Sequence, residues 1–498
     1  MRRDEAEAIA LAGGQPARAL VAELIEQLEA LTGQVGAGIE QVATLAAEVE
    51  ELKRIVDRDS QNSSSPPSSD PPKSRAERRR LAREAYKRSM RKSGGQPGHE
   101  GKTRELAAPE RVDERRVHLP ERCACGHCFD GSEQPIGDPV THQQYELPVI
   151  RPLVIEHSRV RLGCPQCGCA SLAGLPGPAL AGFGPRLDAH IAMLAGVLRL
   201  SREDVRRVVV EVFGVPASTG SIDSAIMRMS AILADPWAEL RHAIRQGEVV
   251  HADETTWRLA GAQQWLWVAA SALAACYRID PSRSQKAAKA LLGEDFGGFV
   301  VSDRYVGYHF LDVLQQQLCW CHVIRQLVEV SQRSGAAGRR GRKLVALARQ
   351  VIGVHRACLQ DDRDAQWLAD QLAPLRTQIH ELLEQCAAGH HARTANFAAG
   401  LLGEYDALWT FADVPQAHID PTNNAAERAV RHAVLMRKIQ GGTQSDRGSR
   451  WVERIQSVRE TCRLQKRPVL EWLTQAATAA HRGLPVPTLL PAAAAQGP

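Results

Sequence analysis

The sequence lacks a long apolar run and a secretory leader. Its most apolar stretch, Ile191–Leu200, is far shorter than the about 20 residues that a membrane-spanning helix needs. The N-terminal MRRDEAEAIA is acidic and has no apolar core of the kind that a signal peptide requires. These absences exclude a membrane protein and a secreted protein, so we expect a cytoplasmic one.

Cysteine is also scarce. The 12 cysteines among 498 residues are too few for a disulfide scaffold of this length, and several stand in close pairs, which favours metal binding. With 44% apolar and 24% charged residues, the chain can bury a core. Its length predicts about three domains of ~150 residues each.

The net charge of +5 hides an uneven distribution. Residues 1–58 hold 6 basic and 11 acidic residues, whereas 73–92 hold 10 basic and 2 acidic ones. Residues 333–349 add 6 basic residues and no acidic one, and 423–467 hold 11 basic against 4 acidic. Three separate basic segments predict a polyanion that contacts several parts of the molecule, with Arg78, Arg79 and Arg80 in the first. The alternative is ordinary solvated surface charge.

The N-terminal segment, residues 1–60, carries a heptad repeat. Position a of the heptad holds valine or leucine, at Val21, Leu28, Val35, Val42, Val49 and Val56. Position d holds leucine, at Leu24, Leu31, Leu45 and Leu52. This pattern favours a parallel two-stranded coiled coil and therefore a homo-oligomer. The alternative is an amphipathic helix packed on its own domain. Residues 61–118, with NSSSPPSSDPP, the basic run and GGQPGHEG, are predicted to be a linker.

Residues 119–175 form a cysteine module. Two C-x-x-C pairs can complete a closed structural Zn²⁺ site, and the ligands we choose are Cys125, Cys128, Cys164 and Cys167. Cys123 is a spare candidate. Alternating residues in THQQYELPVI and IEHSRVRLG predict a hairpin that brings the pairs together. Four free buried thiols are the alternative.

Residues 176–240 are predicted to be helical. SREDVRRVVVEVFG begins with a serine cap and ends at Gly214, and Ser218 or Thr219 can cap a second helix, SIDSAIMRMSAIL. This spacing is typical of a helix-turn-helix that binds DNA, although many helical hairpins bind none.

Two aspartates lie in predicted strands of the domain that spans 241–480. In VVHADETTWRL, Asp253 shares a strand face with Trp257 and Leu259, whereas Glu254 points the other way and is expected to be dispensable. In FVVSDRYVGYH, Asp303 alternates with apolar residues. An ionised carboxylate on an apolar face is costly unless it is paired or binds metal. Three strands, a helix and a fourth strand with the second aspartate make the ribonuclease-H-like order, which places the two aspartates on neighbouring strands.

A third carboxylate is expected from a helix. DPTNNAAERAVRHAVLMRK predicts a helix with Glu427 on the same stripe as Val430 and Val434. With Asn424 as the N-cap, however, Glu427 would be at N3 and could be a capping residue.

Together these segments resemble the transposases of the insertion-sequence-66 family. The resemblance rests on NSSSPPSSD, RKSGGQPGHEGKTR, the cysteine pairs, HADETTWRL, SDRYVGYH, CWCHVIR and NNAAERAVRHAVLMRK. It implies a multidomain α+β protein with a coiled coil, a zinc-binding module, a helix-turn-helix and a ribonuclease-H-like catalytic core. The implied Asp-Asp-Glu triad is Asp253, Asp303 and Glu427. Cys319-Trp-Cys-His322 also resembles a Cys-x-x-His signature of several transposase groups, but we do not predict a metal site there.

The chain between Asp303 and Glu427 is longer than a ribonuclease-H-like core needs, and its extra part, about 323–418, is predicted to be a helical insertion. Residues 481–498 are predicted to be a disordered tail. The resemblance implies an enzyme that cuts and joins double-stranded DNA in the nucleoid. Mg²⁺ or Mn²⁺ at the triad would assist the reaction, and other proteins of the same element would accompany it. The alternatives are a non-catalytic zinc-containing regulator and a hydrolytic nuclease of the same fold. Candidates for phosphate contacts are Arg428, Arg431, Arg437 and Lys438.

Overall fold

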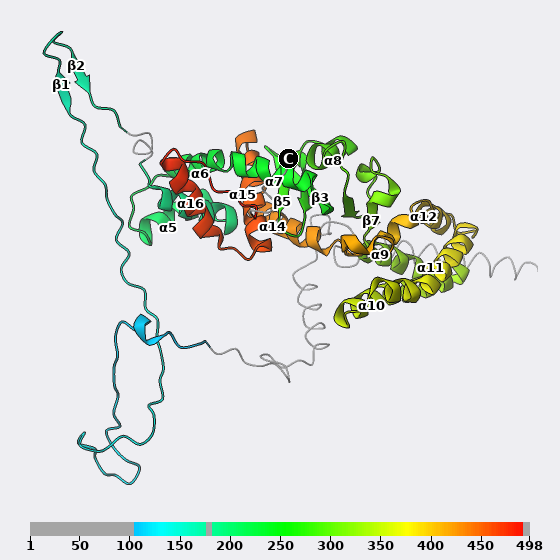
Figure 1. The fold of residues 1–498 in the computed structure, drawn as a ribbon, viewed down its shortest axis with the longest axis horizontal. Helices are drawn as coiled ribbons and strands as arrows, with labels where there is room; N and C mark the ends of the chain where they lie inside the picture. The colour runs from blue at the N-terminus through cyan, green and yellow to red at the C-terminus, as the bar shows by residue number, and fades with distance from the viewer. Residues whose placement is uncertain (1–103, 176–181, 492–498) are drawn as a thin grey trace, which may run out of the picture. The chain divides into compact units, whose positions relative to one another are not determined.

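The computed structural model describes residues 104–175 and 182–491 (Figure 1). The chain divides into two compact units, Met1–Val149 and Ile150–Pro498. The predicted coiled coil and Arg78, Arg79 and Arg80 lie outside the described residues. None of the described helices is long and apolar enough to cross a membrane.

The first unit has little regular structure where it is described. A short 3₁₀ helix, η2, spans Pro109–Arg111, and an isolated bridge joins Arg122 and Cys128. The predicted strand at 141–150 is wrong, because no strand forms there. In the second unit, β1 (Arg161–Gly163) pairs with β2 (Ala170–Leu172). The hairpin that does form therefore surrounds the second cysteine pair and does not span the gap between the pairs.

The second unit continues with a helical region. Its elements are α4 (Pro185–Ala192), the π-helical turn η4 (Met193–Val197), α5 (Arg202–Glu211), α6 (Thr219–Ile232) and α7 (Ala234–Arg245). The predicted caps are confirmed: the Ser201 side chain accepts from the Asp204 amide at the start of α5, and Ser218 accepts from the Ser221 amide at the start of α6. Such caps stabilise a helix end by about 1 kcal/mol each.

A mixed five-stranded sheet follows in the order β5-β4-β3-β6-β7. Its elements are β3 (Val249–Leu259), β4 (Ala262–Ala270), β5 (Ala275–Asp280), α8 (Gln285–Leu292), β6 (Phe299–Ser302) and β7 (Gln316–Leu318), with the short helices η5 (Val306–Tyr308) and η6 (Val313–Gln315) before β7. The first three strands are antiparallel, and β6 and β7 run parallel to β3. The predicted order of three strands, a helix and a fourth strand beside the first is confirmed.

Three C-terminal helices pack on this sheet: α14 (Asn424–Gln440), α15 (Asp446–Leu464) and α16 (Val469–His481). Along the free edge of β5, the amides of Ala275, Tyr277 and Ile279 donate to side chains of α15. The acceptors are spaced four residues apart on one face of the helix, at Glu453, Ser457 and Thr461. Every second amide of β5 thus bonds to every fourth residue of α15, and the edge has no unsatisfied amides at these three positions.

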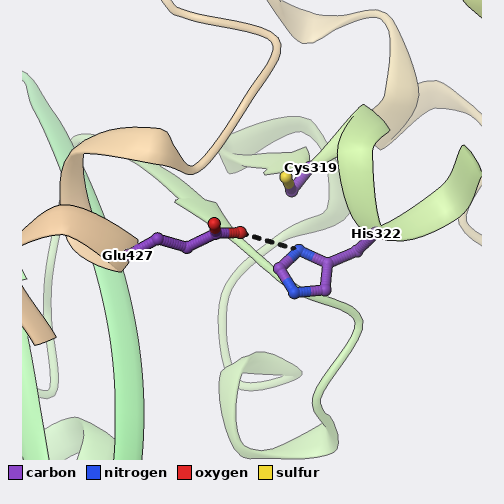
Figure 2. Close-up of side chains that lie close together, drawn as sticks. All are labelled: Cys319, His322 and Glu427. Carbon is purple, nitrogen blue, oxygen red and sulfur yellow. Dashed lines mark ion pairs between the residues drawn. The ribbon is translucent and has the colours of Figure 1, made fainter. Parts of the chain in front are cut away.

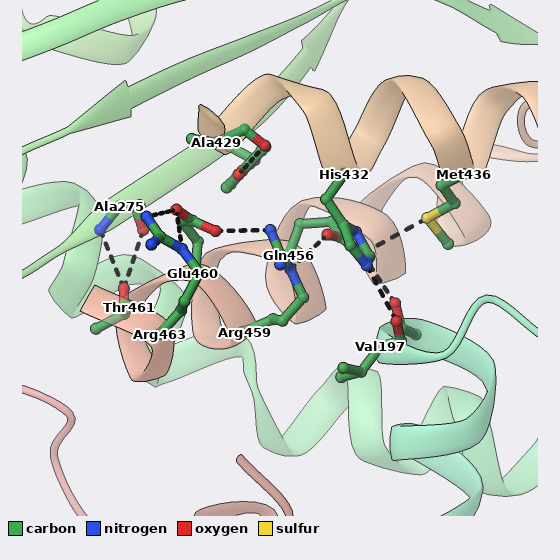
Figure 3. A network of polar contacts seen from close by, with 12 residues as sticks. Val197, Ala275, Ala429, His432, Met436, Gln456, Arg459, Glu460, Thr461 and Arg463 are labelled. Atoms are coloured by element: carbon green, nitrogen blue, oxygen red, sulfur yellow. Dashed lines mark hydrogen bonds and ion pairs between the residues drawn. The ribbon is translucent and has the colours of Figure 1, made fainter. Parts of the chain in front are cut away.

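Below that edge, α15 carries a buried carboxylate between two arginines (Figure 3). Glu460 is 1% exposed and pairs with Arg459 and Arg463 at 2.7 and 2.5 Å. Gln456 donates to the Gly196 carbonyl at 3.0 Å, which connects α15 to η4. The predicted disordered tail from residue 481 is also wrong in its first part, since Leu489 and Leu490 are buried in the core.

Between β7 and α14 the chain forms the predicted helical insertion. Its elements are α9 (Trp320–Ser331), α10 (Gly335–Gln360), α11 (Ala365–Ala387), α12 (Ala392–Gly403), η7 (Asp406–Leu408), α13 (Thr410–Asp413) and η8 (Pro415–Ala417). It has a hydrophobic core of its own, which includes Trp320 and Trp409 and reaches the sheet at Val301 and Leu318. A Cβ atom at position 338 would lie 1.7 Å from the Arg333 carbonyl oxygen, so only glycine fits at Gly338 near the start of α10.

The two ends of the insertion meet, and we call this contact the neck. The amide of Trp320 donates to the Pro421 carbonyl at 3.0 Å. The amide of Asn423 donates to the Cys319 Sγ at 3.1 Å. The neck therefore joins the end of β7 directly to the start of α14.

Candidate active site

Asp253 is near the middle of the central strand β3, half-buried, and its Oδ1 accepts from the Glu254 amide at 2.8 Å. Burial raises the pKa of Asp253 well above its usual range, and the negative charges of Glu254, Asp303 and Glu427 raise it further. Desolvation and like charges both disfavour an ionised carboxylate. Asp253 thus lies in an acidic environment that a bound cation would stabilise.

Asp303 is the residue that directly follows β6, not a residue within it. β6 pairs with β3 in parallel, with Val301 opposite His251, so the chain reaches Asp303 two residues beyond this pair and Asp253 two residues beyond it on β3. Asp303 Oδ1 accepts from the Tyr305 amide at 3.0 Å. The first two predicted carboxylates, Asp253 and Asp303, therefore lie at the same level of the sheet on neighbouring segments of the chain.

Glu427 lies in the first turn of α14, and the structure places the N-cap at Asn423 instead of Asn424. Glu427 is therefore at the fourth helical position, and no side-chain capping hydrogen bond forms at this helix start. Its amide donates to the Asn423 carbonyl in the ordinary helical way. The capping alternative for Glu427 has no support in this geometry.

Two contacts hold α14 against β3. The Asn423 side-chain amide donates to the Ala252 carbonyl at 2.7 Å, one residue before Asp253. Farther along, the Arg437 guanidinium donates to Thr255 and Thr256 of β3. These bonds fix the distance between the strand that carries Asp253 and the helix that carries Glu427.

Glu427 also faces two residues of the neck (Figure 2). Its Oε1 lies 3.6 Å from the Nδ1 of His322, and the Cys319 Sγ is beside them. Cys319 precedes α9 as its N-cap and His322 lies in the first turn of α9. Within the described part of the chain, this is the one group of three metal-type ligands whose atoms lie within 4.8 Å of one another. The oxygens of Asp253, Asp303 and Glu427 do not come together as closely.

Glu254 is the residue that sequence reasoning misjudged. Its side chain is 1% exposed and accepts from Arg283 at 2.6 and 2.8 Å and from the Tyr308 hydroxyl at 3.0 Å. Arg283 in turn stacks over the ring of Tyr305, 3.8 Å from its centroid. Burial and the charge of Asp303 raise the pKa of Glu254, and Arg283 opposes that rise. A buried ion pair therefore supports the segment that follows Asp303.

The other acidic candidates near the sheet have structural roles. Glu453 accepts from the Ile279 amide at 2.7 Å on the β5 edge. Asp420 accepts from the amide and hydroxyl of Thr422, both at 2.7 Å, in a turn before α14.

The predicted phosphate contacts on α14 fall into two groups. Arg428, Arg431 and Lys438 are exposed. Arg437 is half-buried and its guanidinium already donates to β3, so its role in this structure is to hold α14 on the sheet. The basic stretch of 333–349 lies mainly on α10, where Arg339, Arg342, Lys343 and Arg349 are exposed.

The second predicted cysteine pair, Cys164 and Cys167, lies in a tight turn, whereas the turn in the first unit contains Cys123 and Cys125 and not the predicted pair Cys125 and Cys128. In the first unit, the amide of Gly126 donates to the Cys123 carbonyl at 2.9 Å. In the second, the amide of Gly168 donates to the Cys164 carbonyl at 2.9 Å, and the Cys164 amide donates to Cys169. Both glycines have positive φ, +94° and +70°, which glycine adopts without strain. Hydrogen bonds from backbone amides lower the pKa of Cys123 and of Cys167.

Comparison with known proteins assigns the chain to a family. Residues 181–450, which contain all three carboxylates, match the family described as Transposase IS66 family. This match covers more than half of the chain, and the chain therefore belongs to the IS66 family of transposases. Residues 8–105 match a family of unknown function, DUF6444.

Two relatives come from Sinorhizobium fredii (strain NBRC 101917 / NGR234). The uncharacterized protein y4hP is 24% identical over 404 residues, which cover 73% of this chain and 72% of that protein. The uncharacterized protein y4qI is 25% identical over 275 residues, 49% of each chain. The match to y4qI thus spans about half the length of both proteins.

Proposed function

We propose that this transposase cuts and joins DNA strands with Asp253, Asp303 and Glu427 as ligands of two divalent cations, Mg²⁺ or Mn²⁺. The observation that carries this proposal is geometric: β6 pairs with β3 in a register that sets Asp303 level with Asp253, and the Asn423 side chain ties the start of α14 to Ala252, next to Asp253. Three carboxylates from β3, the end of β6 and α14 therefore face one region. The strand order supports it too, because it is the ribonuclease-H-like order.

The residues fit hard divalent cations. Mg²⁺ prefers oxygen ligands and is usually held by a few carboxylates together with substrate phosphates. The Oε1 of Glu427 is buried and has no hydrogen-bond partner in the described part of the chain. When bound, two such ions activate the attacking oxygen and stabilise the leaving oxygen of an in-line displacement.

The proposed reaction has two displacements at phosphorus. In the first, a water oxygen bonds to phosphorus, the bond to the 3′ oxygen breaks, and the proton that water gives up goes to that 3′ oxygen. In the second, the oxygen of the freed 3′ hydroxyl bonds to a phosphorus of the target strand, the bond from that phosphorus to its own 3′ oxygen breaks, and the proton of the attacking hydroxyl goes to the leaving 3′ oxygen. Exposed Arg428, Arg431 and Lys438 of α14 would position the DNA phosphates beside Glu427.

The remaining parts of the chain have proposed supporting roles. The heptads of 1–60 would hold two copies together, Cys125, Cys128, Cys164 and Cys167 would bind a structural Zn²⁺, and companion proteins of the element would join the assembly. For α5 and α6, DNA reading is less well supported. Arg228 is the one basic residue of α6, and it pairs with buried Asp188 at 2.7 Å. Any base contact by α6 would depend on polar residues such as Thr219 and Ser224.

The decisive experiment incubates the purified chain with Mg²⁺ and labelled DNA from the boundaries of its own element. We expect a nicked or cut end and a product in which that end is joined to a target strand. Cleavage without joining would identify a hydrolytic nuclease instead. Binding without cleavage would identify a regulator.

Salt dependence tests the basic run at 73–92. Replacing Arg78, Arg79 and Arg80 together by Ala should flatten the slope of log K against log salt by about 2.7, if each meets one phosphate. The measurement is DNA binding by fluorescence anisotropy over a range of salt concentrations. An unchanged slope would place the DNA on other parts of the chain.

Glu254→Gln tests the buried ion pair. The substitution removes the charge that Arg283 binds, so we expect a loss of about 1.5–3 kcal/mol in the free energy of unfolding and slower cleavage, because the segment after Asp303 loses its support. Chemical denaturation and the cleavage assay are the measurements. Glu203→Gln is the matched control, since Glu203 pairs with Arg206 at the surface and should change stability by no more than about 1 kcal/mol. Equal behaviour of the two variants would contradict the role of Glu254.

A further inference from the structure

The neck brings two donor atoms that the proposed reaction does not use, those of Cys319 and His322, next to Glu427, which the proposed reaction does use. Cys319 is 1% exposed, and its Sγ is fixed by the Asn423 amide at 3.1 Å. His322 reaches the same point from the first turn of α9, and Glu427 reaches it from the first turn of α14 (Figure 2). Three ligands from two helix starts thus converge, and the neck bonds hold those helix starts together.

Two of these donor atoms are unsatisfied. The Nδ1 of His322 and the Oε1 of Glu427 are buried, and neither has a hydrogen-bond partner among the residues that the structure describes. They lie 3.6 Å apart. The two atoms form an ion pair at this distance, which is too long for a hydrogen bond. A buried polar atom without a hydrogen bond costs about 1–3 kcal/mol, so an occupant bonded to both atoms would be stabilised here.

The spacing and the donor types fit one kind of occupant. Tetrahedral Zn²⁺ binds sulfur at about 2.3 Å and nitrogen or oxygen at about 2.0–2.2 Å, which puts neighbouring ligand atoms roughly 3.3–3.7 Å apart. The 3.6 Å between His322 and Glu427 is in this range. The Cys319 Sγ lies within 4.8 Å of both atoms and would move closer to them on binding. Thiolate and imidazole are ligands that Zn²⁺ accepts readily, whereas Mg²⁺ requires oxygen.

We infer that Cys319, His322 and Glu427 bind one Zn²⁺, and that this ion inhibits the transposase by withholding Glu427 from Asp253 and Asp303. The inhibitory part rests on the proposed function, because it assigns Glu427 to both sites. Binding forms a zinc–sulfur bond and releases the thiol proton of Cys319 to solvent. Three protein ligands leave a fourth position for water. Glu427 then exchanges between a soft-ion site at the neck and a hard-ion site at the sheet.

Zinc content of the full-length protein tests the binding directly. The protein is loaded with Zn²⁺, dialysed and analysed for metal per chain. We expect Cys319→Ser and His322→Gln each to lose one equivalent, and Cys358→Ser to lose none, because Cys358 is a buried thiol of α10 outside the neck. Cys125→Ser removes the zinc that the cysteine pairs would hold, so that the zinc at the neck can be counted separately. Equal zinc in the wild type, Cys319→Ser and His322→Gln would overturn the inference.

Cobalt provides a second readout that does not depend on activity. Co²⁺ in the wild type should show a thiolate charge-transfer band that weakens in Cys319→Ser and keeps its intensity in Cys358→Ser. Circular dichroism establishes that each variant is folded, and His322→Gln decides the matter if Cys319→Ser does not fold. An identical cobalt spectrum in both neck variants and the wild type would exclude the site.

Inhibition is measured by titrating Zn²⁺ into the cleavage assay at constant Mg²⁺. We expect the wild type to be inhibited at a Zn²⁺ concentration at least tenfold below that needed for Cys319→Ser. Equal inhibition of the two would overturn the regulatory part. If the wild type cleaves no DNA at all, the proposed function fails, while the zinc content and cobalt spectra still decide whether the neck binds metal.

Discussion

Asp303→Asn should abolish both DNA cleavage and strand joining. The amide is nearly the same size as the carboxylate but is a poor ligand for a hard divalent cation, so both displacements lose the same ions. If the lost stabilisation is about 4 kcal/mol, the rate falls by about a thousandfold. Gel assays of labelled DNA measure the two products. DNA binding should be retained or become tighter, because one negative charge near the phosphates is gone.

Asp312→Asn is the matched control for this substitution. Asp312 is exposed and caps η6, where its carboxylate accepts from the Leu314 amide at 2.9 Å. Asparagine is an equally good cap, so activity should stay close to that of the wild type. A folded Asp303→Asn protein that still cuts and joins DNA would remove Asp303 from the proposed set of cation ligands.

Arg228→Met should cause the largest loss of stability. Asp188 of α4 is fully buried and accepts two hydrogen bonds from Arg228 of α6, at 2.7 and 3.0 Å. His481 of α16 lies 3.7 Å away. Removing one partner of a buried pair leaves an uncompensated charge, at a cost of about 3–5 kcal/mol. Urea denaturation measures it, and Arg206→Met, which breaks a surface pair, should cost no more than about 1 kcal/mol.

The double variant Asp188→Leu/Arg228→Met should recover much of that loss, since it removes both charges. pH gives an independent check. Burial raises the pKa of Asp188, although Arg228 opposes that rise. An acid with a raised pKa binds more protons in the folded state, so stability falls as pH rises from its usual range through the raised value. The loss in Arg228→Met should therefore be smaller in acid than at neutral pH. A loss that does not depend on pH would contradict this account.

Local patterns predicted the parts of the fold that local chemistry determines. The serine caps of α5 and α6 and the alternation in β3 are visible in the sequence because each depends on residues within a few positions. The hairpin at 141–150 was predicted by the same alternation and does not form. In that segment Tyr145, Leu147 and Val149 are exposed, so no packed face supports a strand.

The candidate site was predictable only in part, for the same reason. Asp253 and Asp303 stood out because each follows apolar strand residues. Nothing local distinguished Glu254, which is buried because Arg283 and Tyr308, both distant in sequence, enclose it. Likewise, Cys319 and His322 approach Glu427 only through the neck, a tertiary contact across the whole insertion.

The neck also makes the outer part of the helical insertion, α10 and α11, replaceable as a cassette. The chain leaves the sheet at Trp320 and returns to it at Pro421, where the two residues are hydrogen-bonded. The inner part stays tied to the sheet, because Glu404 pairs with Arg304, the residue after Asp303. Doubling a connection of this kind costs only about 0.6 kcal/mol of closure entropy. Evolution could therefore lengthen, shorten or exchange this cassette, and with it the exposed arginines of α10, while Asp303 and Glu427 keep their places.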